Sequence, residues 1–179
     1  MKHFTRTKNI FHLISNIMLN AILTSAERTD YINRIASLPE RLCAAVAGLS
    51  DEQIDTPYRD GGWTVRQVVH HLADAHINGH IRTRLALTEE HPAVKPYDQD
   101  AWGLLADNAL PIEPSLHILD GLHQRWSVLW KSLPESAYLR TVHHPDNGTM
   151  ALSDILITYA NHGDNHLKQI TDLRQRKGW

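Results

Sequence analysis

Two histidines near the carboxyl end of the chain are spaced so that they could act together. His162 and His166 lie in the stretch YANHGDNHLKQI, and residues four apart share one side of a helix. Counted at about 100° per residue, four neighbours fall within about 40° of His166: Ile155, Tyr159, Ile170 and Leu173. The histidine pair therefore lies on an apolar stripe and is predicted to point into the protein.

Two buried imidazoles on one helix face need partners, because each ring carries a hydrogen-bond donor and an acceptor. One interpretation is a pair of core histidines that hydrogen-bond to neighbouring groups. The other is a metal ion bound by both rings, as in the H-E-x-x-H helices of metalloproteases. Here the pattern is H-G-D-N-H, which lacks the glutamate that acts as base in those enzymes. The spacing favours a shared metal ion but excludes the zincin mechanism.

A metal site requires a third ligand, and a second histidine-rich segment offers four candidates. His70 falls on the far side of the apolar stripe of its helix and is expected to be solvated. His71 lies at the margin of that stripe, whereas His76 lies nearer its middle. His76 and His80 form a further pair four residues apart, which is also compatible with an interior polar pair. Helix counting therefore leaves His71 and His76 as competing third ligands.

Four main helices are predicted to position these histidines. Apolar residues recur with a helical period in four segments, roughly residues 26–48, 65–87, 114–133 and 153–177. Thr64 and Gln67 form a capping box that opens the second helix. Ser153 is expected to cap the last helix, and Pro39 is expected to bend or restart the first.

A long polar segment separates the second and third helices. It runs from His91 to Pro114 and contains four prolines. Its length predicts that it crosses the bundle or helps to form a site rather than closing a tight hairpin. The stretch HHPDNGTM, His143 to Met150, predicts a tight turn between two short extended pieces. The predicted fold is all-α, a four-helix bundle with one long crossing loop.

The composition fits one globular domain. The 179 residues suffice for a single domain at residues 25–179, which follows a poorly ordered or amphipathic extension at residues 1–24. A formal net charge of -2 gives no basic field for nucleic acid or a membrane surface. No run of about 20 apolar residues that could span a bilayer occurs. The single cysteine, Cys43, excludes an internal disulfide and fits a reducing, cytoplasmic location.

The chain from about Leu49 to Trp179 resembles the YfiT-like metal-dependent hydrolases of the DinB superfamily. The matching stretches are LSDEQIDTPYRDGGWTVRQVVHHLADAH, RTRLALTEEHPAVKPYDQDAW, LHQRWSVLWKSL, HHPD and YANHGDNHLKQI. The resemblance implies a DinB-type four-helix bundle, usually a homodimer. It also implies one divalent metal ion per subunit, most often zinc and alternatively nickel. By the same resemblance, the three ligands are His71, His162 and His166.

The segment between the last two implied ligands departs from the pattern of close relatives. Those relatives are often rich in histidine there, whereas Gly163, Asp164 and Asn165 occupy the gap in this chain. This difference argues against a catalytic role for the intervening positions.

Three neutral imidazoles would leave a metal ion its full charge and an open coordination position, as in catalytic sites. Zinc in such a site lowers the pKa of bound water to about 7, which supplies hydroxide for hydrolysis. The open position could instead bind a low-molecular-weight thiol as its thiolate, as in related bundles that use bacillithiol or mycothiol. The resemblance implies a metal-dependent hydrolase of a small molecule, with a thiol S-transferase as the alternative. The open position disfavours a third class, a metal-binding protein without catalysis.

Four polar side chains near the implied ligands have two interpretations each. Asp74 and Asn78 follow His71 by one and two turns, where they could orient its ring or be solvated. Arg82 could bind an anionic group of the substrate or form an ordinary ion pair. Tyr159 could donate a hydrogen bond into the site or pack in the core.

Three aromatic residues could surround the same site. Trp63 precedes the capping box of the second helix and is expected to serve as a hydrophobic staple. Tyr97 and Trp102 belong to the long polar segment and are candidates for the walls of a pocket.

Overall fold

The computed structural model describes residues 23–179. The extension predicted at residues 1–24 therefore lies outside the described residues except for its last two. In chain order the elements are α2 (Ser25–Val46), α3 (Asp51–Ile54), α4 (Val65–Thr88), α5 (Gln99–Trp102), η1 (Ala106–Ala109), α6 (Glu113–Lys131), η2 (Glu135–Leu139), β1 (Thr141–His144), β2 (Gly148–Ala151) and α7 (Leu152–Lys177).

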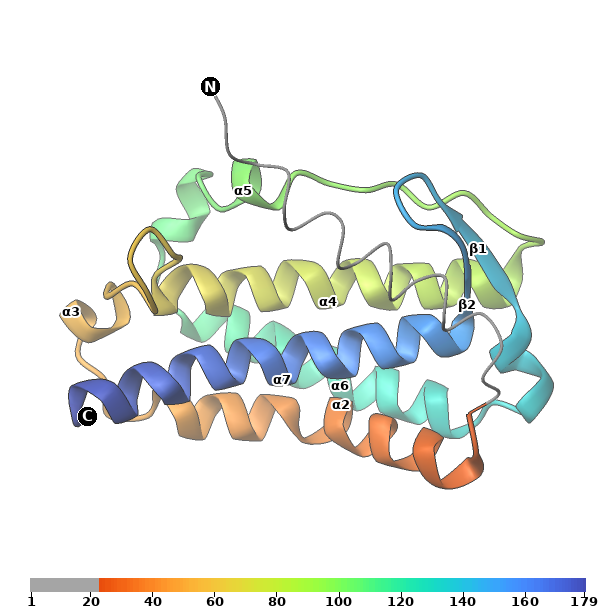
Figure 1. The fold of residues 1–179 in the computed structure, drawn as a ribbon, viewed down its shortest axis with the longest axis horizontal. Coiled ribbons are helices and arrows are strands. Elements are labelled where there is room, and N and C mark those ends of the chain that lie inside the picture. Colours follow the sequence, from red (N-terminus) through yellow and green to blue (C-terminus); the bar gives the residue numbers. More distant parts are fainter. Residues whose placement is uncertain (1–22) are drawn as a thin grey trace.

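Four long helices, α2, α4, α6 and α7, form a bundle, as predicted (Figure 1). α2 packs against α6 and α7, and α4 packs against the same two helices. α2 and α7 run in one direction, while α4 and α6 run in the other (Figure 1). The long segment between α4 and α6 returns along the bundle and carries α5 (Figure 1). This return confirms the predicted crossing loop and makes α4 and α6 parallel.

The helix starts follow local hydrogen bonding. The Thr64 hydroxyl accepts from the backbone N–H of Gln67 at 3.1 Å, and Gln67 Oε1 accepts from the backbone N–H of Thr64 at 3.0 Å. This reciprocal pair confirms the predicted capping box. The prediction that Ser153 caps the last helix is wrong, because α7 already begins at Leu152. The carboxylate of Asp154 accepts from the backbone N–H of Ala151 at 2.8 Å and takes that role.

Of the two alternatives predicted for Pro39, a bend or a restart, the restart does not occur, because α2 continues through Pro39 as one helix. A proline within a helix removes the N–H that the carbonyl four residues earlier would accept. Here that carbonyl belongs to Ile35, and it accepts a hydrogen bond from His123 Nδ1 at 2.6 Å instead. The substitute donor satisfies the freed carbonyl and allows the helix to continue.

A short antiparallel hairpin closes one end of the bundle. β1 pairs with β2 in a register that joins Val142 to Met150, and the turn ends at Gly148 with a φ of 72°. The tight turn predicted for this stretch is therefore confirmed. The returning segment adds to the hairpin, because Val94 N–H donates to the carbonyl of His143 at 2.9 Å.

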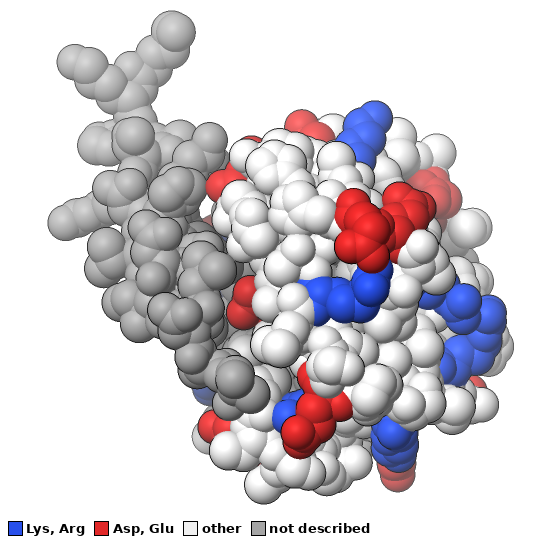
Figure 2. All heavy atoms as spheres, turned by 90° about the vertical axis from the view of Figure 1, so that its right-hand side faces the viewer, with Lys and Arg blue, Asp and Glu red and all other residues white. Residues whose placement is uncertain are grey.

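The surface at this end of the molecule carries charges of both signs. Figure 2 shows acidic and basic side chains interspersed among neutral ones on this face. Within residues 23–179, no helix is long and apolar enough to cross a membrane.

Candidate metal centre

α4 and α7 bring three histidines together inside the bundle. One ring nitrogen from each of His71, His162 and His166 lies within 4.8 Å of the corresponding nitrogens of the other two. The ring centroids are separated by 5.0 Å between His71 and His162, 4.9 Å between His71 and His166, and 4.5 Å between His162 and His166. The stripe that carries the α7 pair is buried at Ile155, Ile170 and Leu173, as helix counting predicts. The three predicted ligands therefore form one compact cluster.

The Nε2 atoms of His71 and His162 face each other within the cluster. The Nε2 atoms of His71 and His162 are 3.0 Å apart. The Nδ1–H of His166 donates to Gln169 Oε1 at 2.8 Å, which leaves a lone pair on Nε2 for a metal ion. Tetrahedral zinc with Zn–N bonds of about 2.0–2.1 Å separates its nitrogen ligands by about 3.3 Å. The observed spacing fits such an ion after small side-chain adjustments.

Burial holds the cluster in its neutral form. It lowers the pKa of His71 from 6.5 to about 3, with a smaller contribution from the neighbouring His166. Burial also lowers the pKa of His162 well below its usual value, aided by His166 and His71. The pKa of His166 is lowered by burial as well, although the hydrogen bond to Gln169 opposes this shift. Neutral imidazole is the form that binds metal ions, so the ligands need no deprotonation at pH 7.

The structure separates the two competing third ligands. His71 belongs to the cluster, whereas the fully buried His76 lies behind it. His76 Nε2 is 3.3 Å from His162 Nδ1, and His76 Nδ1 is 2.9 Å from His123 Nε2. His76 therefore contacts the ring of one candidate ligand on the side opposite the cluster centre. His80 is also buried, and it accepts a hydrogen bond from Arg84 Nε at 3.1 Å.

The expectation that His70 is solvated is wrong. His70 is buried, its Nδ1 lies 2.7 Å from Ser115 Oγ, and its Nε2 lies 3.1 Å from the carbonyl oxygen of Leu110. Helix counting placed this ring away from the main stripe of α4 correctly. It could not show that the start of α6 and the segment before it cover that side.

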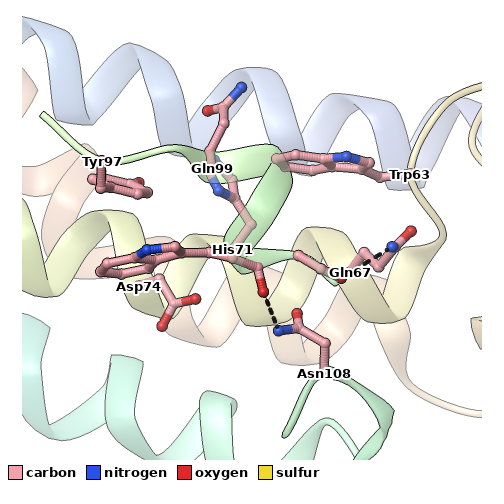
Figure 3. Close-up of a pocket in the computed structure, with 9 residues that line it drawn as sticks. Trp63, Gln67, His71, Asp74, Tyr97, Gln99 and Asn108 are labelled. Carbon is pink, nitrogen blue, oxygen red and sulfur yellow. Dashed lines mark hydrogen bonds between the residues drawn. The ribbon is translucent and has the colours of Figure 1, made fainter. Parts of the chain in front are cut away.

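A pocket opens beside His71 (Figure 3). Aromatic rings and side-chain amides dominate its lining, which consists of Trp63, Gln67, His71, Asp74, Tyr97, Gln99, Trp102, Gly103 and Asn108. Tyr97 and Trp102 both line the pocket, as predicted. Their ring centroids are 4.4 Å apart. Trp63 packs edge-on against His71 at 4.6 Å and lies parallel to the ring of His166 at 6.3 Å. Trp63 thus covers the cluster as well as preceding α4.

The other polar candidates have specific partners. Arg82 donates to the hydroxyl of the buried Tyr159 at 3.1 Å and to the backbone oxygen of Lys95 at 2.9 Å, so it links α7 to the segment after α4. Asn78 donates to the backbone oxygen of Asp74 at 2.9 Å rather than to His71. The carboxyl of Asp74 lies in the pocket wall, where burial and the charge of Asp107 raise its pKa.

Sequence reasoning missed two residues near the cluster, Gln169, which contacts His166, and His123, which contacts His76. Gln169 follows His166 by three positions, which places it one turn away on the same helix face. His123 lies four residues after Leu119 and three before Trp126, both of which are buried positions of α6. In both cases the spacing from neighbouring residues on the same helix was the feature of the sequence that could have identified the residue.

Two of the three residues between the α7 histidines, Gly163 and Asp164, contact α2. A Cβ atom on Gly163 would lie 2.5 Å from Cδ2 of the buried Leu38, so a larger residue there would force the Leu38 side chain to move. Asp164 pairs with Arg34 Nε and Arg41 Nη1 of α2, each at 2.7 Å. Gly163 and Asp164 thus both join α7 to α2.

Comparison with known proteins places this chain in a family. The family described as the DinB superfamily matches residues 34–170. Because the match spans most of the chain, the protein belongs to the DinB superfamily. It is similar to YfiT from Bacillus subtilis, with 43% identity, a TM-score of 0.85, and coverage of 88% of this chain and 91% of that one. YfiT is described as a probable metal-dependent hydrolase with an unusual four-helix bundle topology.

Two further relatives carry the same functional name, "putative metal-dependent hydrolase". The relative from Oceanobacillus iheyensis is 46% identical over 166 residues, which cover 93% of this chain and 91% of the relative. The relative from Geobacillus thermodenitrificans is 51% identical over 153 residues, with coverage of 84% and 85%. The likeness therefore extends over nearly the whole of each protein.

Proposed function

We propose that the protein is a metal-dependent hydrolase that holds one zinc or nickel ion on the Nε2 atoms of His71, His162 and His166. The observation that carries this proposal is the convergence of three neutral imidazoles, one of which, His71, lines a small pocket. Three histidine ligands leave a further position for water or substrate, as in catalytic rather than structural zinc sites. The names of the relatives support the same class of reaction.

The ion, when bound, would supply a Lewis acid that lowers the pKa of a water molecule to about 7. The protein would contribute the binding surface for a small-molecule substrate. Trp63, Tyr97 and Trp102 offer flat apolar faces, and Gln67 and Gln99 offer amide groups for hydrogen bonding.

Asp74 is our candidate for proton transfer at this site. It lies in the same pocket wall as His71, and burial raises the pKa of its carboxyl group. A raised pKa brings a carboxyl group closer to the range in which it can both accept and donate a proton near neutral pH. We place this reaction in the reducing cytoplasm, to which the single cysteine points.

A substrate screen tests the proposed reaction. The untagged protein, loaded with zinc or nickel, is assayed against esters and amides without added thiol. We expect cleavage that is lost in His162→Ala and retained in His117→Ala, because His117 is exposed on α6. Turnover of an electrophile such as monochlorobimane only in the presence of a thiol would contradict hydrolysis. That result would favour the alternative, a thiol S-transferase.

A further inference from the structure

A chain of hydrogen bonds leads from His162 away from the cluster and across the bundle. His162 Nδ1 lies 3.3 Å from His76 Nε2, and His76 Nδ1 lies 2.9 Å from His123 Nε2. The chain ends where His123 Nδ1 meets the backbone oxygen of Ile35 at 2.6 Å. Each of the four residues belongs to a different long helix, namely α7, α4, α6 and α2 in that order. His76 and His123 are fully buried, so water does not compete for these contacts.

The last acceptor in the chain is available because of Pro39. In an α-helix the carbonyl of Ile35 would accept from the backbone N–H of residue 39, but proline has no N–H. The carbonyl is buried among the packed helices, where an unpaired polar group is costly. The His123 Nδ1–H group supplies the missing donor. The sequence of α2 thus determines which nitrogen of a histidine on α6 carries the proton.

The carbonyl also sets the direction of every hydrogen bond in the chain. A carbonyl oxygen only accepts, so His123 has its proton on Nδ1 and a lone pair on Nε2. That lone pair accepts from His76 Nδ1–H, which leaves the lone pair of His76 on Nε2. His76 Nε2 in turn accepts from His162 Nδ1–H. The remaining lone pair of His162 is on Nε2, the atom that lies 3.0 Å from His71 Nε2.

We propose that His76 and His123 are positioning residues that fix the tautomer and the ring orientation of His162, with the Ile35 carbonyl as their terminal acceptor. This inference rests on the proposed metal site, because it assigns His162 Nε2 as the ligand atom. Partners at the second nitrogen orient a metal-ligating histidine and increase its basicity. Because the chain ends at a carbonyl, it cannot pass a proton further and serves orientation rather than proton exit.

Nitrogen-15 NMR of the full chain tests the tautomers directly. Long-range spectra of histidine-labelled protein without metal distinguish Nδ1–H rings from Nε2–H rings. We expect His123, His76 and His162 to carry their protons on Nδ1, both without metal and with zinc. An Nε2–H form of His76 or His123 would overturn the inference. The spectrum without metal does not depend on zinc binding. Intact tautomers in a wild-type protein that fails to bind zinc would therefore reject the metal site alone.

Zinc affinity of three variants tests the consequence for the ligand. We expect His123→Phe, which keeps a ring but loses both nitrogens, to weaken zinc binding about 10- to 100-fold in competition with a chelating dye. His123→Gln keeps one donor and one acceptor and should recover most of that loss. His80→Phe, a buried histidine of α4 outside the chain, should bind zinc as the wild type does.

Three outcomes of these titrations would overturn the proposal. They are wild-type affinity in His123→Phe, equal losses in His123→Phe and His123→Gln, or an equal loss in His80→Phe. The second and third outcomes would show that the side chain of His123 serves packing alone. Should His123→Phe fail to fold, the tautomer spectra of the wild type still decide the question.

Discussion

The three histidines of the cluster are held in different ways. His166 is fixed by a neighbour on its own helix, Gln169, at 2.8 Å. His162 is fixed by His76 on another helix. His71 instead packs edge-on against Trp63. The orientation of each ring therefore depends on a different part of the sequence, and the contributions can be tested one residue at a time.

Removing the acceptor beside His166 should weaken metal binding. In Gln169→Leu the Nδ1–H of His166 loses its partner, and the ring is free to turn or to change tautomer. We expect zinc affinity to fall about 10- to 100-fold, measured by dye competition. Gln175→Leu is the matched control, because Gln175 is exposed near the end of the same helix. Equal affinity in Gln169→Leu and the wild type would show that this hydrogen bond does not support the site.

At the scale of residues, the sequence predicts which face of a helix a side chain occupies better than it predicts which side chains of other helices it contacts. The spacing of His162 and His166 places both on the buried stripe, because helical periodicity is a local property. His71 and His76 both point inward, and periodicity alone cannot tell which of them meets α7. His123 and Gln169 had the right spacing, but their importance depends on contacts that only the packed helices create.

At the scale of elements, the approach of α7 to α4 depends on a glycine. A Cβ atom at Gly79 would lie 2.6 Å from Cζ of Tyr159 and 2.7 Å from Cη2 of Trp126. Both aromatic side chains are buried and cannot move away easily. The absence of a side chain at this position allows α4, α6 and α7 to meet beneath the histidine cluster.

We therefore expect Gly79→Ala to destabilise the fold by about 1–3 kcal/mol through overpacking. Gly121→Ala is the control, because a Cβ atom there meets nothing within 4 Å. That change should stabilise α6 by about 0.5–1 kcal/mol, since alanine favours the helix. Urea unfolding measures both values. A Gly79→Ala variant as stable as the wild type would contradict this expectation, because it would mean that Tyr159 and Trp126 move aside without loss of stability.

The sequence predicted where a helix begins when a side-chain cap was present, as at Thr64. The sequence could not distinguish a bend from a restart at Pro39, because the donor for the freed carbonyl comes from α6, far away in the sequence. The long loop between α4 and α6 was predicted to cross from its length alone, and Figure 1 shows it running back along the bundle. Which helices pack against each other, by contrast, depends on contacts between side chains that the sequence pattern does not predict.

At the scale of the whole molecule, the buried histidines link stability to pH. Burial lowers the pKa of His123 from 6.5 to about 4, although the backbone oxygen of Ile35 opposes the shift. The unfolded chain therefore binds more protons than the folded protein between these two pH values. The contribution of a neutral His123 to stability is complete above about pH 6.5 and is lost as the pH falls toward 4.

The urea concentration at the unfolding midpoint of the metal-free protein should accordingly decrease as the pH is lowered from 7 to 4. His123→Gln should show a shallower decline over the same range, because glutamine does not titrate there. The decline should not vanish, since the pKa of His71 is also lowered, to about 3. Identical slopes in the wild type and His123→Gln would contradict a neutral, buried His123.

The central claim is that His71, His162 and His166 together bind one metal ion. Elemental analysis of the full-length protein, purified without a histidine tag and dialysed after zinc loading, tests it most directly. We predict about one equivalent of zinc or nickel per chain in the wild type and in His117→Ala, and a loss of about tenfold or more in His162→Ala. A wild-type protein without stoichiometric metal, or undiminished metal in His162→Ala, would contradict the claim.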